Sequence, residues 1–327
     1  MANLTTTYLG IKLKNPIIAG SCGITNSVDS IKKLVDNGIA AVVLKSLFEE
    51  QIIFNANQKV SESELDYPEA YDYIKNYSKL NDVAAYLNLI RQAKKETNIP
   101  IIASVNCISS NEWVAFAKEI ENVGADALEL NIMVLSSNPN LSSQEHEKIM
   151  FDIIQEVRQH TKLPIAVKVN SHLSGLAHFI QKLDWSKLIQ GIVFFNRQFS
   201  PDIDLEQMKI ISSNIFSSHT DYSESLRWVA IMSDRINMDI AATTGIWEAK
   251  TIVKQILAGA NAVQIASVLY KNGPTYIQTM LNEMEQWMDS KGYHSLNEFK
   301  GLMSKEKIHL PSAFERIQFM RYFSNIE

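Results

Sequence analysis

Short apolar runs without polar alternation recur along the chain, and longer amphipathic segments separate them. Continuous runs of this kind are typical of strands buried on both faces, as in a parallel sheet. Eight strands alternating with helices over about 250 residues predict a TIM (β/α)8 barrel, and we expect residues 1–327 to form one domain. The runs are NPIIAG (15–20), AAVVLKS (40–46), IPIIASVN (99–106), DALELN (126–131), LPIAVKVN (163–170), QGIVFFN (190–196), DIAATTG (239–245) and NAVQIAS (261–267).

The segments between the runs have helical spacing, for example at 111–124 and 145–160. An open doubly wound sheet is the competing fold, but no GxGxxG motif follows the first strand. Two connections are unusually long, at 47–80 after the second strand and at 197–224 after the sixth. Both follow the carboxyl ends of their strands, so we predict two insertions that cover a substrate site. A further helix near 274–290 is expected to pack outside the barrel.

Composition and charge exclude several functions. The net charge of -5, without a basic stripe, argues against nucleic acid as the main partner. The two cysteines, Cys22 and Cys107, form no CxxC or Cys/His ligand pattern, which favours a reducing compartment and gives no support to a metal centre. The chain shows neither a signal-like N-terminus nor an apolar run of membrane-spanning length. We therefore expect a cytoplasmic protein with no membrane partner.

If the eight runs are barrel strands, their last residues meet at one mouth. Two lysines, three asparagines and clusters of small residues would converge there, with no carboxylate at these positions. Such a site suits an anionic, planar, hydrogen-bonding ligand better than a divalent metal or a glycoside held by paired carboxylates. The strand-end residues are Ala19, Gly20, Lys45, Ser46, Asn106, Cys107, Asn131, Lys168, Asn196, Thr243, Thr244, Gly245, Ala266 and Ser267.

These motifs together resemble the dihydroorotate dehydrogenase family, in particular its cytosolic branch. The resemblance covers nearly the whole chain and implies an FMN-containing barrel enzyme that acts on CH–CH groups, such as dihydroorotate oxidation to orotate in pyrimidine biosynthesis. It also implies a small anionic substrate and a soluble electron acceptor or partner flavoprotein, and it allows a homodimer. The motifs that carry it are NPIIAGSCG, VVLKSLFEEQI, IPIIASVN, GADALELN, PIAVKV, GIVFFNR, DIAATTGI and LAGANAVQIAS.

The resemblance also assigns roles to single residues. Lys168 resembles the lysine that reaches the N1/O2 edge of the flavin, where a cation stabilises the charge of the reduced ring. Lys45 and Ser46 resemble a Lys-Ser pair beside the isoalloxazine, and Lys45 is a candidate catalytic group. Asn131 and Asn196 resemble amides that contact the flavin or substrate. The expected backbone lining is Ala19 and Gly20, and the expected phosphate cradle is Ser217, Ser218, Thr244, Gly245, Ala266 and Ser267.

The chain departs from the family pattern after the fourth strand. The family carries NxSCPN or NxSSPN there, in which Cys or Ser removes the substrate proton, whereas this chain has NIMVLSSNPN. Val134 occupies the counted position of the base and cannot accept a proton. Ser136 or Ser137 could be shifted into that role, although a serine needs assistance to act as a base. The family's substrate loop after the second strand is absent as well.

Two other functions remain open at this point. Lys45 or Lys168 could serve as a Schiff-base nucleophile in a lyase or aldolase built on the same barrel. Alternatively, the protein could be a degenerate relative that binds a flavin or another phosphate-bearing ligand without turnover. The missing base at Val134 favours the second of these alternatives over an ordinary family enzyme.

Overall fold

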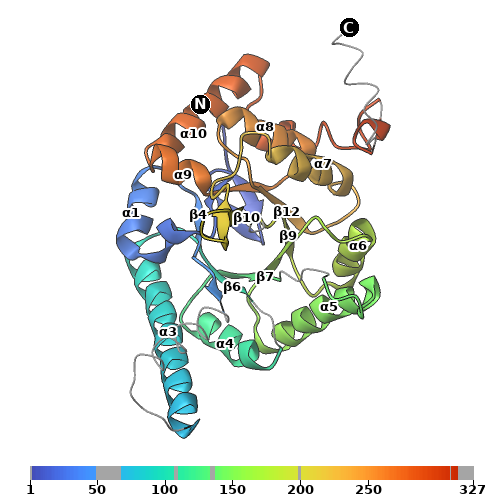
Figure 1. The fold of residues 1–327 in the computed structure, drawn as a ribbon. Helices are drawn as coiled ribbons and strands as arrows, with labels where there is room; N and C mark the ends of the chain where they lie inside the picture. Colours follow the sequence, from blue (N-terminus) through green and yellow to red (C-terminus); the bar gives the residue numbers. More distant parts are fainter. Residues whose placement is uncertain are drawn as a thin grey trace.

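The chain folds into a closed barrel of parallel strands inside a ring of helices (Figure 1). The computed structural model describes residues 2–48, 68–106, 110–132, 137–197, 200–309 and 311–315. The barrel strands are β3 (Ile17–Ala19), β4 (Ala41–Val43), β5 (Leu47–Phe48), β6 (Ile101–Asn106), β7 (Ala127–Asn131), β8 (Ile165–Val169), β9 (Gly191–Phe194), β12 (Asp239–Thr243) and β13 (Ala262–Ile265). They pair in the order β4–β3–β13–β12–β9–β8–β7–β6–β5, and a further β4–β6 pairing closes the ring. The predicted TIM barrel is confirmed.

The helices cover the outer face of the barrel, and each predicted amphipathic segment lies in one of them. The segment 145–160, for example, falls in α5, whose start is fixed by a capping box. There Ser142 Oγ accepts the Glu145 N–H at 3.3 Å and a Glu145 carboxylate oxygen accepts the Ser142 N–H at 2.6 Å. The helices are α1 (Val28–Asp36), α3 (Pro68–Glu96), α4 (Ser110–Asn122), α5 (Ser143–His160), α6 (Leu176–Ser186), α7 (Tyr222–Met232), α8 (Ala249–Ala258), α9 (Ser267–Asn272) and α10 (Tyr276–Lys291).

A short antiparallel hairpin, β1 (Thr6–Tyr8) and β2 (Ile11–Leu13), plugs the amino-terminal end of the barrel. Its side chains Tyr8, Leu9 and Leu13 are buried against small residues of the barrel strands. A Cβ at Gly191 would lie 2.5 Å from Leu9 Cδ2, so a larger residue here would displace the Leu9 side chain. The small residues around the plug include Ala41, Ala127, Ala166, Ala241 and Ala262.

The second barrel strand is interrupted, because β4 and β5 are two pieces that both pair with β6. The Leu44 N–H donates to the Ile102 carbonyl at 2.9 Å, and pairing resumes where Leu47 faces Val105. The residues between, Lys45 and Ser46, leave the ladder at the carboxyl end of the barrel. Of the long connection predicted at 47–80, residues 68–80 belong to the helix α3, and residues 49–67 lie outside the described part of the chain.

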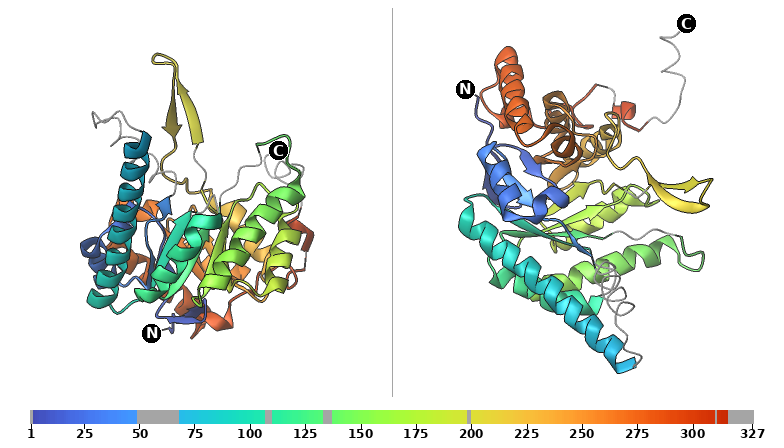
Figure 2. Two further views of the ribbon diagram at one scale, coloured as in Figure 1. Left: turned by 90° about the horizontal axis from the view of Figure 1, so that it is seen from below. Right: turned by 60° about the vertical axis from the view of Figure 1, so that its left-hand side comes forward.

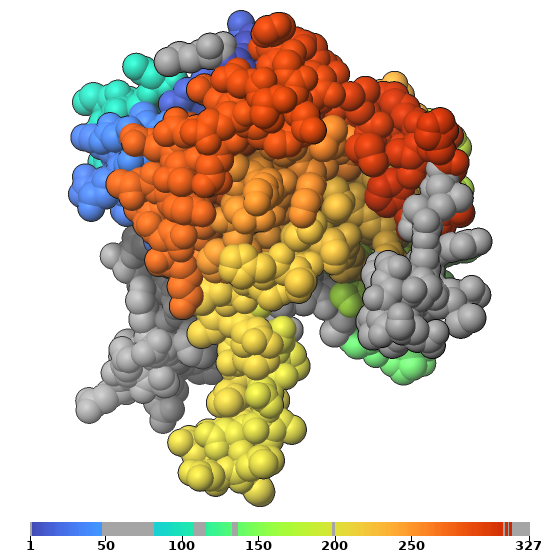
Figure 3. Space-filling view, turned by 90° about the horizontal axis from the view of Figure 1, so that it is seen from above, coloured from blue at the N-terminus to red at the C-terminus, as the bar shows by residue number. Residues whose placement is uncertain are grey.

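The second long connection contains a β-hairpin that stands away from the barrel. Strands β10 (Ser200–Asp204) and β11 (Lys209–Ser213) pair antiparallel, with Ile203 opposite Ile210 and Asp204 opposite Lys209. Figure 2 shows this hairpin rising from the end of the barrel opposite the N-terminus, and Figure 3 shows that it projects freely. The insertion is therefore an ordered arm at the mouth.

The carboxyl-terminal helices pack outside the barrel as predicted. The helix α8 buries Ile252, Val253 and Ile256 against the sheet, and α10 packs against α8 through buried methionines such as Met280. Among the described helices, none is both long and apolar enough to cross a bilayer. The assignment of residues 1–327 to a single cofactor-binding domain remains a prediction.

Candidate active site

A cavity of about 110 Å³ lies at the carboxyl ends of β8, β9, β12 and β13. The barrel topology brings these strand ends together, although they are far apart in sequence. Most of the predicted cofactor residues on these strands meet here. The lining consists of Ser21, Lys168, Phe195, Asn196, Arg197, Ser217, Thr243, Thr244, Gly245, Ile246, Gln264, Ile265, Ala266 and Ser267.

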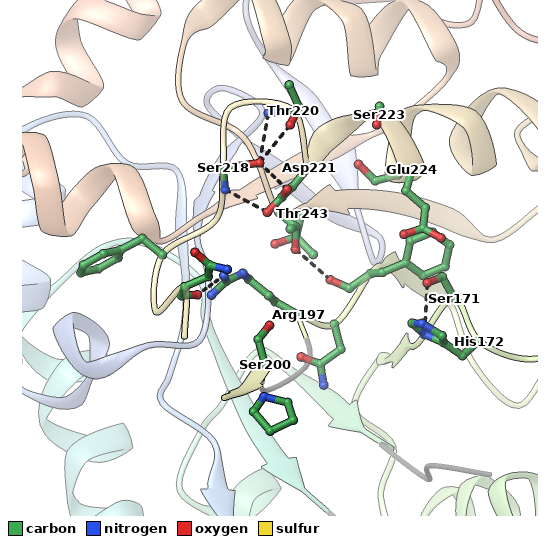
Figure 4. A pocket seen from close by; sticks show the side chains of 17 residues that line it. Ser171, His172, Arg197, Ser200, Ser218, Thr220, Asp221, Ser223, Glu224 and Thr243 are labelled. Carbon is green, nitrogen blue, oxygen red and sulfur yellow. Dashed lines mark hydrogen bonds between the residues drawn. The ribbon is translucent and has the colours of Figure 1, made fainter. Parts of the chain in front are cut away.

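A larger pocket of about 1040 Å³ adjoins the cavity and shares Asn196, Arg197 and Thr244 with it. Figure 4 shows polar side chains around this pocket, among them His172 after β8 and Glu224 near the start of α7. The Arg197 guanidinium donates at 2.6 Å to the Ile215 carbonyl and also to that of Asn214, so it joins the base of the β10–β11 arm to the barrel. The cavity and the pocket therefore form one continuous site beneath the arm.

The residues at the ends of the strands did not reveal a buried carboxylate that contacts two residues of this cavity. Glu129, on β7, is 1% exposed, and its Oε1 lies 2.8 Å from Lys168 Nζ. Gln264 Nε2, on β13, donates to the other oxygen, Glu129 Oε2, at 2.5 Å. The signal was available, because side chains alternate along a strand and Glu129 therefore points to the same side as Asn131. The prediction of a site without carboxylates is therefore wrong, because Glu129 lies directly behind Lys168 and Gln264.

The two predicted amides lie together. Asn196 follows β9 and its Nδ2 donates to Asn131 Oδ1 across the barrel mouth. The Asn131 side chain is buried, and Asn196 lines both the cavity and the larger pocket. This hydrogen bond fixes the orientation of both amides, since an amide oxygen can only accept and an amide NH₂ group can only donate.

The small residues form a tight wall at one end of the cavity. Thr244 and Gly245 both have left-handed backbone, with φ of 71° and 73°. A Cβ at Gly245 would lie 2.3 Å from the Tyr222 backbone nitrogen, so no side chain fits there. Ser217 donates to Ser267 Oγ through its backbone N–H at 3.0 Å and through its hydroxyl at 3.1 Å. These residues bring backbone and hydroxyl groups close to the cavity, as a phosphate cradle requires.

Ser218 makes different contacts from those of Ser217. Its N–H donates to an Asp221 carboxylate oxygen at 2.9 Å, and its hydroxyl donates to the other oxygen of the same carboxylate. It lines the larger pocket but not the smaller cavity. An aspartate beside its donors repels a phosphate, so the structure argues against Ser218 as a phosphate ligand.

Ala19 and Gly20 do not line the cavity, and Gly20 contacts Gln264 and Ile265, which do. Ala19 is fully buried, and the Gly20 N–H donates to the Ile265 carbonyl at 2.8 Å. A Cβ at Gly20 would lie 3.3 Å from Gln264 Cβ, so glycine lets the Gln264 side chain pass. The next residue, Ser21, is the one from this strand that lines the cavity.

A chain of hydroxyl groups supports Ser46 where the second strand leaves the ladder. Ser46 N–H donates to Ser21 Oγ at 2.9 Å, and Ser46 Oγ lies 2.7 Å from Ser104 Oγ. Tyr86 of α3 replaces the missing strand pairing, because its hydroxyl accepts the Ser104 N–H at 2.7 Å and donates to the Ser104 carbonyl at 3.0 Å. Burial raises the pKa of the Tyr86 phenol, which keeps it a donor. Lys45, next to Ser46, is half-buried.

Ser136 and Ser137 are the predicted candidates for the proton-removing base. Val134 and Ser136 lie outside the described residues, and so does Cys107. Ser137 is exposed. The half-buried thiol of Cys22 has a pKa raised by burial, which lowers its reactivity.

The family model for dihydroorotate dehydrogenase matches residues 3–288. The chain belongs to the dihydroorotate dehydrogenase family. The catalytic subunit of dihydroorotate dehydrogenase B (NAD(+)) from Thermoplasma volcanium is 25% identical over 325 residues, covering 93% of this chain and 100% of the relative. The subunits of the same name from Methanocaldococcus jannaschii and Bacillus cereus are each 24% identical, covering 91% and 94% of this chain and 97% and 99% of the relatives.

Membership of the dihydroorotate dehydrogenase family makes the protein an oxidoreductase of the CH–CH class. The family consists of flavoproteins, so a flavin is the expected cofactor of this barrel. The relatives are named as catalytic subunits, which means that they work with another subunit. The cavity described above lies at the barrel end where such enzymes carry their sites.

We predict that Tyr86→Phe lowers the free energy of unfolding by about 1–3 kcal/mol, because the Ser104 N–H and carbonyl lose their buried partner. Urea unfolding of the purified protein measures this change. Tyr276→Phe, at a half-buried tyrosine of α10, is the matched control and should change stability by about 0.5 kcal/mol or less. Equal effects of the two substitutions would contradict a special role for Tyr86.

Proposed function

We propose that the chain binds one non-covalent FMN and uses it to oxidise or reduce a carbon–carbon bond of a small anionic substrate. The observation that carries the proposal is the cavity that combines Lys168, Asn196, Gly245, Ser217 and Ser267. A cation, an oriented amide and a wall of close backbone groups suit a ligand with a planar polar ring and a phosphate. Dihydroorotate chemistry in pyrimidine biosynthesis is the reaction type that the family supports.

The described residues fit the phosphate of FMN at one end of the site. Gly245 packs directly against the backbone of Tyr222, so its lack of a Cβ is what lets the turn after β12 lie against the start of α7 at this wall of the cavity. Ser217 and Ser267 offer hydroxyl groups on the other side of the same wall. The Thr244 hydroxyl, like that of Ser217, already donates to a protein oxygen, here the Phe195 carbonyl at 3.3 Å.

Two other residues that line the same cavity suit the polar edge of a flavin ring. Lys168 supplies a buried ammonium group and Gln264 a buried side-chain carbonyl, Oε1, that has no hydrogen-bond partner among the described residues. A bound FMN would accept the electrons that leave the substrate. We propose that a soluble acceptor or a partner flavoprotein in the cytoplasm then receives them, because the relatives are catalytic subunits whose name includes NAD(+).

The geometry disfavours a Schiff-base lyase at Lys168. A nucleophilic lysine must be neutral, which requires a desolvated amine or a neighbouring cation. Lys168 instead forms an ion pair of 2.8 Å with the buried Glu129 carboxylate, so attack on a carbonyl substrate would first have to break this pair. A colourless protein that is trapped by borohydride with a carbonyl substrate would nevertheless restore that function, with Lys45 as its candidate nucleophile.

We predict that the purified protein, reconstituted with excess FMN, retains one FMN per chain that denaturation releases. Gly245→Ala should lower FMN affinity at least tenfold, since the added Cβ would displace the start of α7. Gly273→Ala is the matched control, because Gly273 also has positive φ but its Cβ would meet nothing within 4 Å. Fluorescence titration of the apoprotein measures both affinities, and no FMN binding by the wild type would refute the proposal.

We predict that dihydroorotate reduces the bound flavin slowly at neutral pH. A positioned acid–base group contributes about 10²–10⁴-fold to such a step, and Val134 has no ionisable atom. Anaerobic stopped-flow measurements on the wild type, Val134→Cys, Ser136→Ala and Ser137→Ala test this. Faster reduction in Val134→Cys would support the prediction. Fast wild-type reduction that collapses in one serine variant would contradict it, and no reduction in any variant would indicate another substrate or a degenerate enzyme.

The β10–β11 arm carries apolar side chains that are exposed to solvent. Ile203 and Ile210 face each other on one side of the hairpin and are 65% and 75% exposed. Isolated two-stranded hairpins are marginally stable, and exposed apolar arms promote association. The exposed apolar residues of the arm are Ile203, Leu205, Met208, Ile210, Ile211 and Ile215.

We propose that a second copy of the chain covers this arm. With exposed fractions of 44–86%, the six side chains present on the order of 800 Å², which is what one partner contributes to a standard interface. A two-fold dimer uses the same patch on both copies, so one self-complementary arm is sufficient. Because Ser200 and Pro201 at the base of the arm line the larger pocket, such a dimer would also border the active site.

We predict that the wild type is a dimer and that Ile210→Glu is a monomer, because a buried unpaired charge on each arm opposes association. Sedimentation velocity over a range of protein concentrations measures the mass. Leu302→Glu is the matched control, since Leu302 is also exposed, by 43%, but lies away from the arm. A monomeric wild type, or a dimer unaffected by Ile210→Glu, would exclude this interface.

A further inference from the structure

Glu129 is a buried carboxylate that the proposed chemistry does not use directly. It is 1% exposed and does not line the cavity, yet both of its polar neighbours do. Lys168 Nζ lies 2.8 Å from one carboxylate oxygen, and Gln264 Nε2 donates to the other. Strands β7, β8 and β13 hold the three side chains, so the whole cluster belongs to the rigid barrel.

The Glu129 carboxylate determines which polar atoms its two neighbours can present to a ligand in the cavity. A carboxylate accepts and cannot donate, so Gln264 must turn its NH₂ group toward Glu129 and leave its carbonyl Oε1 free of that contact. This Oε1 is buried and has no hydrogen-bond partner among the described residues. Lys168, held on the other oxygen, brings a donor to the same cavity. One buried anion thus orients a cationic donor and a neutral acceptor.

Glu129 also changes the charge that a ligand in the cavity meets. The Lys168 side chain is 9% exposed, so little solvent screens it, and its field would otherwise act on the ligand at nearly full strength. With a carboxylate 2.8 Å away, the ligand meets an ion pair instead of an isolated cation. Reduction of a flavin adds negative charge, which an isolated cation stabilises far more than a neutral pair does.

We propose that Glu129 is a positioning residue that balances the charge of Lys168 and so sets the reduction potential of the bound flavin. The inference rests on the proposed function, because it takes FMN as the ligand of this cavity. Glu129 acts through Lys168 and Gln264, both of which line the cavity. Removal of the carboxylate charge therefore raises the potential, and removal of the lysine charge lowers it.

The test compares Glu129→Gln, Lys168→Met and the double variant by equilibrating each FMN-loaded protein with a reference dye. Glu129→Gln should raise the equilibrium constant for flavin reduction at least tenfold, which is ~30 mV for a two-electron couple. Lys168→Met should lower the constant by a similar factor and weaken FMN binding. The double variant should lie within tenfold of the wild type, because it replaces one neutral pair with another.

The double variant keeps the test decisive if either single variant fails to fold, since removing both charges leaves no unpaired ion in the barrel. A double variant as low as Lys168→Met, or a Glu129→Gln potential equal to that of the wild type, would overturn the proposal. Glu147→Gln is the control, because it breaks the Glu147–Lys182 pair of 3.4 Å between α5 and α6 and should leave the potential unchanged. A wild type that binds no FMN would refute the proposed function itself, whereas normal binding with unchanged potentials would refute only the role of Glu129.

Discussion

Closure of the barrel is the constraint on which the rest of this structure depends. Pairing of β4 with β6 and of β13 with β3 joins the strands into a ring, and every side chain that points inward must then find a place in one limited volume. In the half of the barrel at the amino-terminal ends of the strands, alanines leave room for the side chains of Tyr8, Leu9 and Leu13 of the plug. Because that half is packed with apolar groups, the polar chemistry is confined to the carboxyl half.

The inward polar residues of that half depend on one another. Buried polar groups are costly unless they are paired, and two clusters here pair such groups between neighbouring strands and helices. Ser104 is held by Tyr86 and Ser46, where the second strand leaves its ladder. Glu129 is held by Lys168 and Gln264. The polar groups beneath the cavity are therefore buried and continuous with the core.

The periodicity of the sequence predicted the eight barrel strands and the helices between them, because strands buried on both faces leave continuous apolar runs. Strand ends also predicted where Lys168, Asn196, Gly245 and Ser267 would meet, since parallel strands in a barrel end at one mouth. Pairing between residues was not predictable in this way. Glu129 sits two residues before a strand end, and only the inward-pointing register shows that it reaches Lys168.

Local sequence also could not show how the insertions behave. Ser217 and Ser218 look equivalent in the chain, but a hydrogen bond to Asp221 turns Ser218 away from the cavity while Ser217 bonds to Ser267. The 197–224 connection has the length of a substrate cover, yet its central residues form an arm with apolar side chains in solvent. Whether a side chain serves the site or an interface depends on tertiary neighbours that no local pattern records.

The ion pair at the floor also changes how an anionic substrate can be recognised. Two lysines at strand ends indicated a strongly positive mouth, but the charge of Lys168 is opposed by Glu129 at 2.8 Å. The Arg197 guanidinium donates to the carbonyls of Asn214 and Ile215, and these hydrogen bonds to the arm compete with any contact to a ligand. Asp221 and Glu224 add negative charge along the larger pocket. If the substrate is anionic, as we propose, its selection relies on short-range hydrogen bonds from oriented groups such as Asn196, since these charges partly cancel.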